Sequence, residues 1–243
     1  MVVSAAFVGC SDSAKTAKAE KPCDRASKHG YFHFTDPVAA AAIRKDGPEK
    51  LRDLKDAMAQ CQKATEQGDA DAQNSLGYMY AYGLGGLTKD KAQAIAWYRK
   101  AADQGDTRAL RTLSEMYDKG EGVAQDKAQA VMWLRKAAKQ NDVYAVHAQR
   151  KLGDRYFNGE GVPQDKAQAI VWYRKAADQY DSEAQFRLAQ MYEKGDGLTQ
   201  SKIQAARLYC GSVGKGGASY ERESIAGLER MGYTAGSCGL PWL

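Results

Sequence analysis

The sequence has little proline and no long hydrophobic run. It contains 5 Pro against 24 Gly in 243 residues. Few prolines, frequent glycines and alanines at recurring offsets favour short helices ended by glycine turns over a β architecture. No stretch of about 20 apolar residues occurs, so no segment of this sequence is predicted to span a membrane.

An excess of one charge is also lacking. There are 35 Lys and Arg against 30 Asp and Glu, a formal net charge of +5, and the two signs are interleaved. A nucleic-acid or anionic-lipid surface needs a run or patch of basic residues. We therefore expect no nucleic-acid partner and no partner selected mainly by charge.

Motifs of common catalytic and metal sites are incomplete. Cys210–Gly214 lacks the leading glycine of a Gly-x-Ser-x-Gly nucleophile motif, and Gly211–Gly216 has the composition of a turn without the full spacing of a phosphate-binding loop. Cys23, His29 and His33 could supply three zinc ligands, but neither a second Cys pair nor His-Glu-x-x-His accompanies them. We predict no enzyme activity, no cofactor and no metal site.

One segment occurs three times, as Lys89–Ala102, Gln125–Ala138 and Gln164–Ala177. The tryptophans of these copies lie 36 and 39 residues apart, so one unit carries three extra residues. Self-similarity at this period indicates a stacked array of helical units. His147 lies in the three-residue insertion, where we interpret it as a loop residue that is solvated or contacts a partner.

A predicted first helix precedes each copy, and a fourth, partial unit follows. Ala, Leu and Tyr recur at i, i+4 and i+8, which is one face of a helix. These helices are Ala72–Tyr80, Ala109–Tyr117, Ala148–Tyr156 and Ala184–Tyr192. The residue after Leu is always small, as close helix packing requires, and a glycine is expected to end each helix.

The predicted second helices begin with a capping box. Asp90, Asp126, Asp165 and Ser201 each have Gln three residues later. In a capping box the cap side chain accepts one backbone N–H and the Gln reaches back to the N–H of the cap residue. The following stripe, Ala94, Trp97, Tyr98 and Ala101 in the first copy, is expected to be buried, with Arg99 and Lys100 facing water.

Less regular segments flank the array. We expect residues 1–10 to be signal-like and 11–37 to form a flexible tether with an aromatic cap at Tyr31–Phe34. Residues 38–69 form a degenerate leading unit, 70–213 the repeat array, and 214–243 a capping helix, about 219–231, with a tail.

The start of the sequence resembles the lipobox of bacterial lipoproteins. Small and apolar residues, Ala5–Gly9, precede Cys10, and Ser11 follows it. The resemblance implies acylation of Cys10 and sorting to the periplasmic side of the outer membrane, with membrane contact through the lipid anchor only. The alternative is the apolar N-terminus of a cytoplasmic protein.

The other cysteines, Cys23, Cys61, Cys210 and Cys238, are even in number, which suits an oxidising compartment. Their order along the chain suggests the disulfides Cys23–Cys61 and Cys210–Cys238, and other pairings remain open. In a reducing compartment all four would be free thiols.

Leu113–Ala138 resembles a Sel1-like repeat, a relative of the tetratricopeptide unit, and the resemblance extends over about Asp69–Val213. It implies an all-α fold, a right-handed α-solenoid of helix-turn-helix repeats with a terminal capping helix and with the first helices on the concave side. It also implies a role in protein–protein contacts.

Some periplasmic lipoproteins that this chain resembles are immunity proteins, which bind and neutralise toxic effectors of type VI secretion, notably lipases. We take this function as the leading expectation. A general envelope adaptor or scaffold for assembly or signalling is the alternative, and an enzyme acting on cell-wall or β-lactam substrates is the third.

Positions that differ between units on exposed faces of the first helices are the predicted partner-binding residues. Repeats stay near-identical where structure demands it, so a specific partner could recognise the divergent positions, and Tyr and Arg are favoured interface anchors. The alternative is neutral drift on a solvated surface. The candidates are Asn74, Tyr78, Arg111, Glu115, Arg150, Asp154, Arg155, Arg187 and Gln190.

Overall fold

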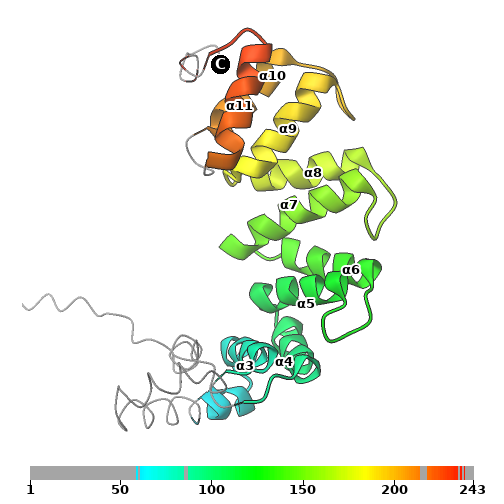
Figure 1. The fold of residues 1–243 in the computed structure, drawn as a ribbon, viewed down its shortest axis with the longest axis vertical. Helices are drawn as coiled ribbons and strands as arrows, with labels where there is room; N and C mark the ends of the chain where they lie inside the picture. The colour runs from blue at the N-terminus through cyan, green and yellow to red at the C-terminus, as the bar shows by residue number, and fades with distance from the viewer. Residues whose placement is uncertain are drawn as a thin grey trace, which may run out of the picture.

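The computed structural model describes residues 59, 61–84, 87–213, 218–234, 236 and 238, and these form an all-helical stack (Figure 1). Four helical pairs follow one another along the stack, and a last helix covers the end. The helices are α3 (Ala70–Tyr82) with α4 (Lys91–Asp103), α5 (Thr107–Lys119) with α6 (Lys127–Ala138), α7 (Val143–Asn158) with α8 (Lys166–Ala177), α9 (Ser182–Lys194) with α10 (Lys202–Ser212), and α11 (Ala218–Arg230). The predicted α-solenoid is therefore confirmed for the described residues.

Glycines end the first helix of every pair. Gly83, Gly120, Gly159 and Gly195 are the C-cap residues of α3, α5, α7 and α9, each in the left-handed conformation that glycine adopts without steric cost. Each cap N–H bonds back to a carbonyl four residues earlier, for example from Gly83 to Met79. The predicted helix ends are thus correct.

The second helices are capped, but only half of the predicted capping box forms. The side chain of Asp126 accepts from the N–H of Gln129 at 2.9 Å, as expected. The N–H of Asp126, however, donates to the carbonyl of Tyr117 at 2.9 Å. Asp90, Asp165 and Ser201 make the same bond to a tyrosine two residues before the end of their own first helix, namely Tyr80, Tyr156 and Tyr192. The turn folds back onto α5, so the N–H of Asp126, which Gln129 was expected to satisfy, already has a partner. The side chain of Gln129 therefore stays exposed.

Close contact between the two helices of a pair depends on the small residue after Leu. A Cβ on Gly153 would lie 2.6 Å from the Tyr173 ring, and one on Gly77 would lie 2.9 Å from Tyr98. Tyr173 and Tyr98 are almost fully buried. The glycines thus allow an aromatic side chain of the second helix to lie directly on the backbone of the first.

The prediction that the repeated tryptophans are buried is correct for one of three and only partly correct for the other two. Trp133 is 7% exposed, but Trp97 and Trp172 are only half-buried. Lys100 lies 3.8 Å from the centroid of the Trp97 ring, and Lys175 lies 4.3 Å from that of Trp172. The lysine one turn later thus covers an otherwise open aromatic face by a cation–π contact.

The three extra residues of the third unit lengthen a helix. α7 has 16 residues where α3, α5 and α9 have 13, and its N-cap is Asp142. The interpretation of His147 as a loop residue is therefore wrong, because it lies inside α7. Three residues add nearly one helical turn, so the rest of the helix keeps its register against α8.

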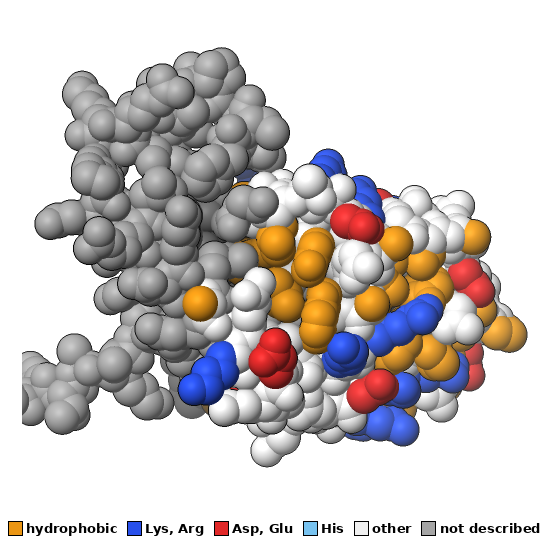
Figure 2. All heavy atoms as spheres, turned by 90° about the horizontal axis from the view of Figure 1, so that it is seen from below, with side chains coloured by type: hydrophobic (Ala, Val, Ile, Leu, Met, Phe, Trp, Pro, Cys, Tyr) orange, Lys and Arg blue, Asp and Glu red, His pale blue; other side chains and the backbone are white. Residues whose placement is uncertain are grey.

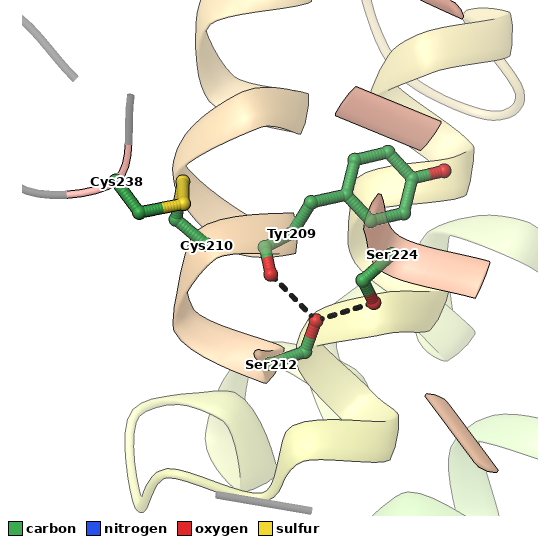
Figure 3. The surroundings of a disulfide bond; sticks show 5 residues. All are labelled: Tyr209, Cys210, Ser212, Ser224 and Cys238. Carbon is green, nitrogen blue, oxygen red and sulfur yellow. Dashed lines mark hydrogen bonds between the residues drawn. A yellow bond between two sulfur atoms is a disulfide. The ribbon is translucent and has the colours of Figure 1, made fainter. Parts of the chain in front are cut away.

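The last helix is fastened to the array at several points. Arg230 contacts Glu193 of α9 through two nitrogens at 3.0 and 3.1 Å, and this guanidinium holds the pKa of Glu193 below its ordinary value. Cys210 of α10 forms a disulfide with Cys238, beside the buried hydroxyls of Ser212 and Ser224 (Figure 3). This is the pairing that the order along the chain suggests.

Several predictions fall partly or wholly outside the described residues. Cys61 is disulfide-bonded and buried, whereas its predicted partner Cys23 lies outside them. The lipobox with Cys10, the tether and the aromatic cap Tyr31–Phe34 also lie outside. Of the expected leading unit, residues 61–66 are seen to be helical.

Candidate functional site

A groove of about 470 Å³ lies between α7 and α9, and we call it the C-terminal groove. Residues spaced three or four apart on each helix form its two walls, because such residues share one helix face. The lining residues are Lys151, Asp154, Arg155, Phe157, Asn158 and Glu160 from α7 and its following turn, Glu183, Arg187, Gln190, Met191, Lys194 and Asp196 from α9 and its following turn, and Tyr173 from α8.

A smaller groove of about 160 Å³ occupies the equivalent place between α3 and α5, and we call it the N-terminal groove. Tyr98 of α4 takes the place of Tyr173, and Lys119 takes that of Lys194. Its other lining residues are Ala81, Tyr82, Lys89, Lys91, Thr112, Glu115, Met116 and Glu121. The solenoid thus has two versions of one groove.

The structure gathers about half of the candidate binding residues into these grooves. Asp154, Arg155, Arg187 and Gln190 line the C-terminal groove, and Glu115 lines the N-terminal one. Asn74, Tyr78 and Arg111 are half-buried on α3 and α5 and do not line either groove. Together α3, α5, α7 and α9 carry these residues on what we call the first-helix face.

The expectation that Arg150 is exposed is wrong. Its side chain is 9% exposed and lies 2.6 Å from Glu183 and 3.3 Å from Asp181. Because α9 begins beside this part of α7, its acidic first turn surrounds the guanidinium. Arg150 therefore joins two units from within and is not available to a partner.

Burial changes the acid–base properties of the groove floor. The Tyr173 hydroxyl donates to Asp154 at 2.8 Å. Burial raises the pKa of Asp154 above its ordinary value, although the hydrogen bond from Tyr173 opposes this shift. Burial also raises the pKa of Tyr173, and the Asp154 carboxylate adds to this shift. The pair fixes the orientation of both side chains at the bottom of the groove.

Sequence reasoning missed two lysines that line the C-terminal groove, Lys151 and Lys194. Lys151 occupies a position that changes in character between the repeats. The equivalent residues in the four units are Ser75, Thr112, Lys151 and Arg187. The position is uncharged in the first two units and cationic in the last two. Comparing units position by position would have selected it.

The serine of the incomplete nucleophile motif is unsuited to catalysis. Ser212 is fully buried, donates to the Tyr209 carbonyl at 2.8 Å and lies 2.7 Å from the Ser224 hydroxyl (Figure 3). A nucleophile needs access to its substrate and a neighbouring base. The two serines instead hold α10 against α11.

The described part of the chain shows no feature of a metalloprotein or of a membrane-spanning protein. Across these residues, no group of three or more His, Cys, Asp and Glu side chains is placed to hold a metal ion. The helices seen there are too short or too polar to cross a bilayer. On the face seen in Figure 2, Lys and Arg side chains alternate with Asp and Glu around hydrophobic patches, so this face offers no basic footprint for a nucleic acid.

Comparison with known proteins agrees with the repeat architecture. The Sel1 repeat model matches residues 70–106, 107–142, 146–181 and 182–210, which is more than half of the chain. A Sel1 repeat protein from Oxalobacter formigenes is 31% identical, with a TM-score of 0.68 over 80% of this chain and 79% of that one. No curated protein matches the chain in sequence.

Two further solved structures share the pattern more distantly. The protective antigen c5321 of uropathogenic Escherichia coli is 33% identical over 74% of this chain and 45% of that one, with a TM-score of 0.47. The immunity protein Pa5087 of Pseudomonas aeruginosa is 22% identical over 84% and 74%, with a TM-score of 0.40, a likeness that bears no functional conclusion. From the repeats and the Oxalobacter structure, this chain belongs to the Sel1 repeat family, whose repeats mediate protein–protein interactions.

Proposed function

We propose that this protein binds and neutralises a toxic effector protein in the periplasm, as an immunity protein against a type VI effector of the lipase class. The observation that carries the proposal is the C-terminal groove. There, positions at which the four units differ line a cavity of about 470 Å³ on an otherwise repeated scaffold. A site of this size accommodates several side chains of another protein.

The cysteines support the proposed compartment. Cys210 and Cys238 form one disulfide and Cys61 takes part in another, and disulfides persist in oxidising compartments. The lipobox-like residues around Cys10 support an anchor at the outer membrane. If so, Cys10→Ser moves the protein from the membrane fraction to the soluble periplasmic fraction. An unchanged distribution on fractionation would argue against the anchor.

Within the described residues the C-terminal groove is larger than the N-terminal one, and one dominant groove favours an inhibitor with one partner over a platform for many. An inhibitor forms a stable one-to-one complex and protects cells that make the toxin, whereas a scaffold recovers several substoichiometric partners. The test is affinity capture from envelope extracts with the full chain as bait, followed by mass spectrometry. Co-expression with the captured protein then shows whether growth is protected.

Matched variants locate the binding face. Thr112→Glu with Gln190→Glu changes the two grooves, whereas Gln93→Glu with Gln168→Glu places the same charges on exposed positions of α4 and α8. We expect the first pair to abolish capture of the partner and growth protection, and the second pair to preserve both. Equal capture by both variants, or several substoichiometric partners, would contradict the proposal.

A further inference from the structure

The most informative difference among the units is a change of charge at one position. Ser75 and Thr112 occupy it in the first two units, and Lys151 and Arg187 in the last two. The two cations stand on opposite walls of the C-terminal groove, one on α7 and one on α9. The small net charge of the whole chain hides this local change.

The groove carries four cations and four carboxylates, yet it is not neutral toward a ligand. Every carboxylate has a partner inside the protein. Asp154 accepts from Tyr173 at 2.8 Å, Glu160 pairs with Arg155 at 2.9 Å, Glu183 pairs with Arg150 at 2.6 Å, and Asp196 pairs with Lys166 at 2.5 Å. A ligand therefore meets carboxylates that are already compensated.

Three of the four cations are compensated much less. The exception is Arg155, which pairs with Glu160 and also lies 2.7 Å from Asp118 of α5. Arg187 reaches a carboxylate, that of Glu183, only at 3.8 Å. Within the residues that the structure describes, the ammonium groups of Lys151 and Lys194 make no hydrogen bond or ion pair, and both side chains are exposed. Three cationic groups are therefore available along one groove.

We propose that the C-terminal groove binds an acidic segment of the protein partner. Its carboxylates contact Arg187, Lys151 and Lys194, and its apolar side chains lie against Phe157, which is half-buried and also lines the groove. This inference rests on the proposed protein-binding function and adds the chemistry of the ligand. Arginine is suited to the task because its planar fork binds a carboxylate through two hydrogen bonds.

The equivalent residues of the first units supply the test variant. Lys151→Ser with Arg187→Thr installs the side chains that the chain already has at Ser75 and Thr112, so the repeat should still fold. Lys119→Ser is the control, because Lys119 holds the place of Lys194 in the N-terminal groove. Circular dichroism and thermal unfolding establish that each variant is folded before binding is measured.

The probe is a short peptide of Glu residues interrupted by Phe and Leu, compared with the same peptide carrying Gln in place of Glu. Both are titrated into the ¹⁵N-labelled full chain and followed by NMR. We expect the Glu peptide to shift amide signals of α7 and α9, to bind about tenfold more tightly than the Gln peptide, and to weaken as salt screens the contacts. The double variant should lose about tenfold in affinity, and Lys119→Ser should lose little.

Three results would overturn the inference. The Gln peptide could bind as well as the Glu peptide, the double variant could bind the Glu peptide unchanged, or Lys119→Ser could weaken it equally. The experiments can refute the acidic-segment inference and the proposed function separately. A stoichiometric captured partner that the double variant binds normally refutes the acidic-segment inference alone, whereas acidic-peptide binding without any captured partner refutes the proposed function alone.

Discussion

The N-terminal and C-terminal grooves have the same construction and different chemistry. In each, a buried tyrosine of the second helix, Tyr98 or Tyr173, lies on a glycine of the first. The residue after that glycine is Tyr78 in the first unit and Asp154 in the third. Tyr173 consequently donates a hydrogen bond to a carboxylate, whereas the neighbours of Tyr98 include Tyr78 and Tyr82, whose rings lie 4.6 Å apart.

This difference shows which sequence positions of a repeat protein can vary between units. Positions that fix the helices and their contact distance stay the same from unit to unit, since every unit must stack on its neighbours. Positions on the groove walls can change charge without disturbing the stack. The walls of the C-terminal groove have diverged more, and the following predictions test the structural roles of residues close to that groove.

The largest expected effect concerns Arg150, whose equivalent in the second unit is Arg111. Replacing Arg150 by Ala leaves Asp181 and Glu183 without their buried partner, so we expect a loss of about 3 kcal/mol in the free energy of unfolding. Arg111→Ala removes one ion pair of 3.9 Å to an exposed Glu115, worth about 0.5 kcal/mol. Urea unfolding of both variants gives the comparison, and equal losses would contradict the buried role of Arg150.

A smaller effect is expected at the glycine beneath Tyr173. Gly153→Ala places a Cβ 2.6 Å from the ring, and overpacking of this kind costs about 2 kcal/mol after the gain in helix propensity. Gly77→Ala should cost less, because the corresponding distance to Tyr98 is 2.9 Å. Thermal and urea unfolding measure both.

The second unit provides a compensating control for this substitution. It already carries Ser114 against Leu134 at the places of Gly153 and Tyr173. Adding Tyr173→Leu to Gly153→Ala should therefore recover part of the lost stability. If the double variant is no more stable than the sum of the single changes predicts, crowding by the ring is not the cause.

The fold class and the helix ends follow from local patterns in the sequence. Asp126 precedes a helix, and Gly120 ends one, because capping depends on a few adjacent residues. The reciprocal half of the capping box was mispredicted because it depends on how the turn returns to the preceding helix. In that turn the Tyr117 carbonyl accepts the hydrogen bond from the backbone N–H of Asp126.

The groove was harder to predict because it depends on contacts between units. The position of Arg150 varies between units, as that of a binding residue would, because Asn74, Arg111 and Phe186 are its equivalents, but the burial of Arg150 is decided by the acidic first turn of α9. Lys151 was overlooked because its charge becomes informative only beside Ser75, Thr112 and Arg187. Variation between repeats therefore selected residues of which about half line the two grooves, without separating internal ion pairs from available cations.

The smallest predicted effect is a pH dependence that comes from the histidine of the third unit. Burial, together with Arg150, lowers the pKa of His147 to about 4, and Arg150 donates to the unprotonated Nδ1 at 2.9 Å. Arg111 and Lys151 also oppose protonation, whereas Glu183 favours it. An unfolded His has a pKa of about 6.5, so the unfolded state takes up the proton first as the pH falls. The stability from neutral His147 is therefore fully present above about pH 6.5 and is lost as the pH falls toward 4.

Because His147 is half-buried, solvent screening should reduce the effect to about 1 kcal/mol. The measurement is the free energy of unfolding of the wild type and of His147→Gln between pH 7 and pH 4. Carboxylates titrate in both proteins, so the difference between the two curves isolates the histidine. The curves should converge as the pH falls, because only the wild type loses this contribution. Parallel curves would mean that Arg150 does not hold His147 in its neutral form. The lengthened start of α7 would then affect the pH dependence of stability no more than the first turns of α3 and α5 do.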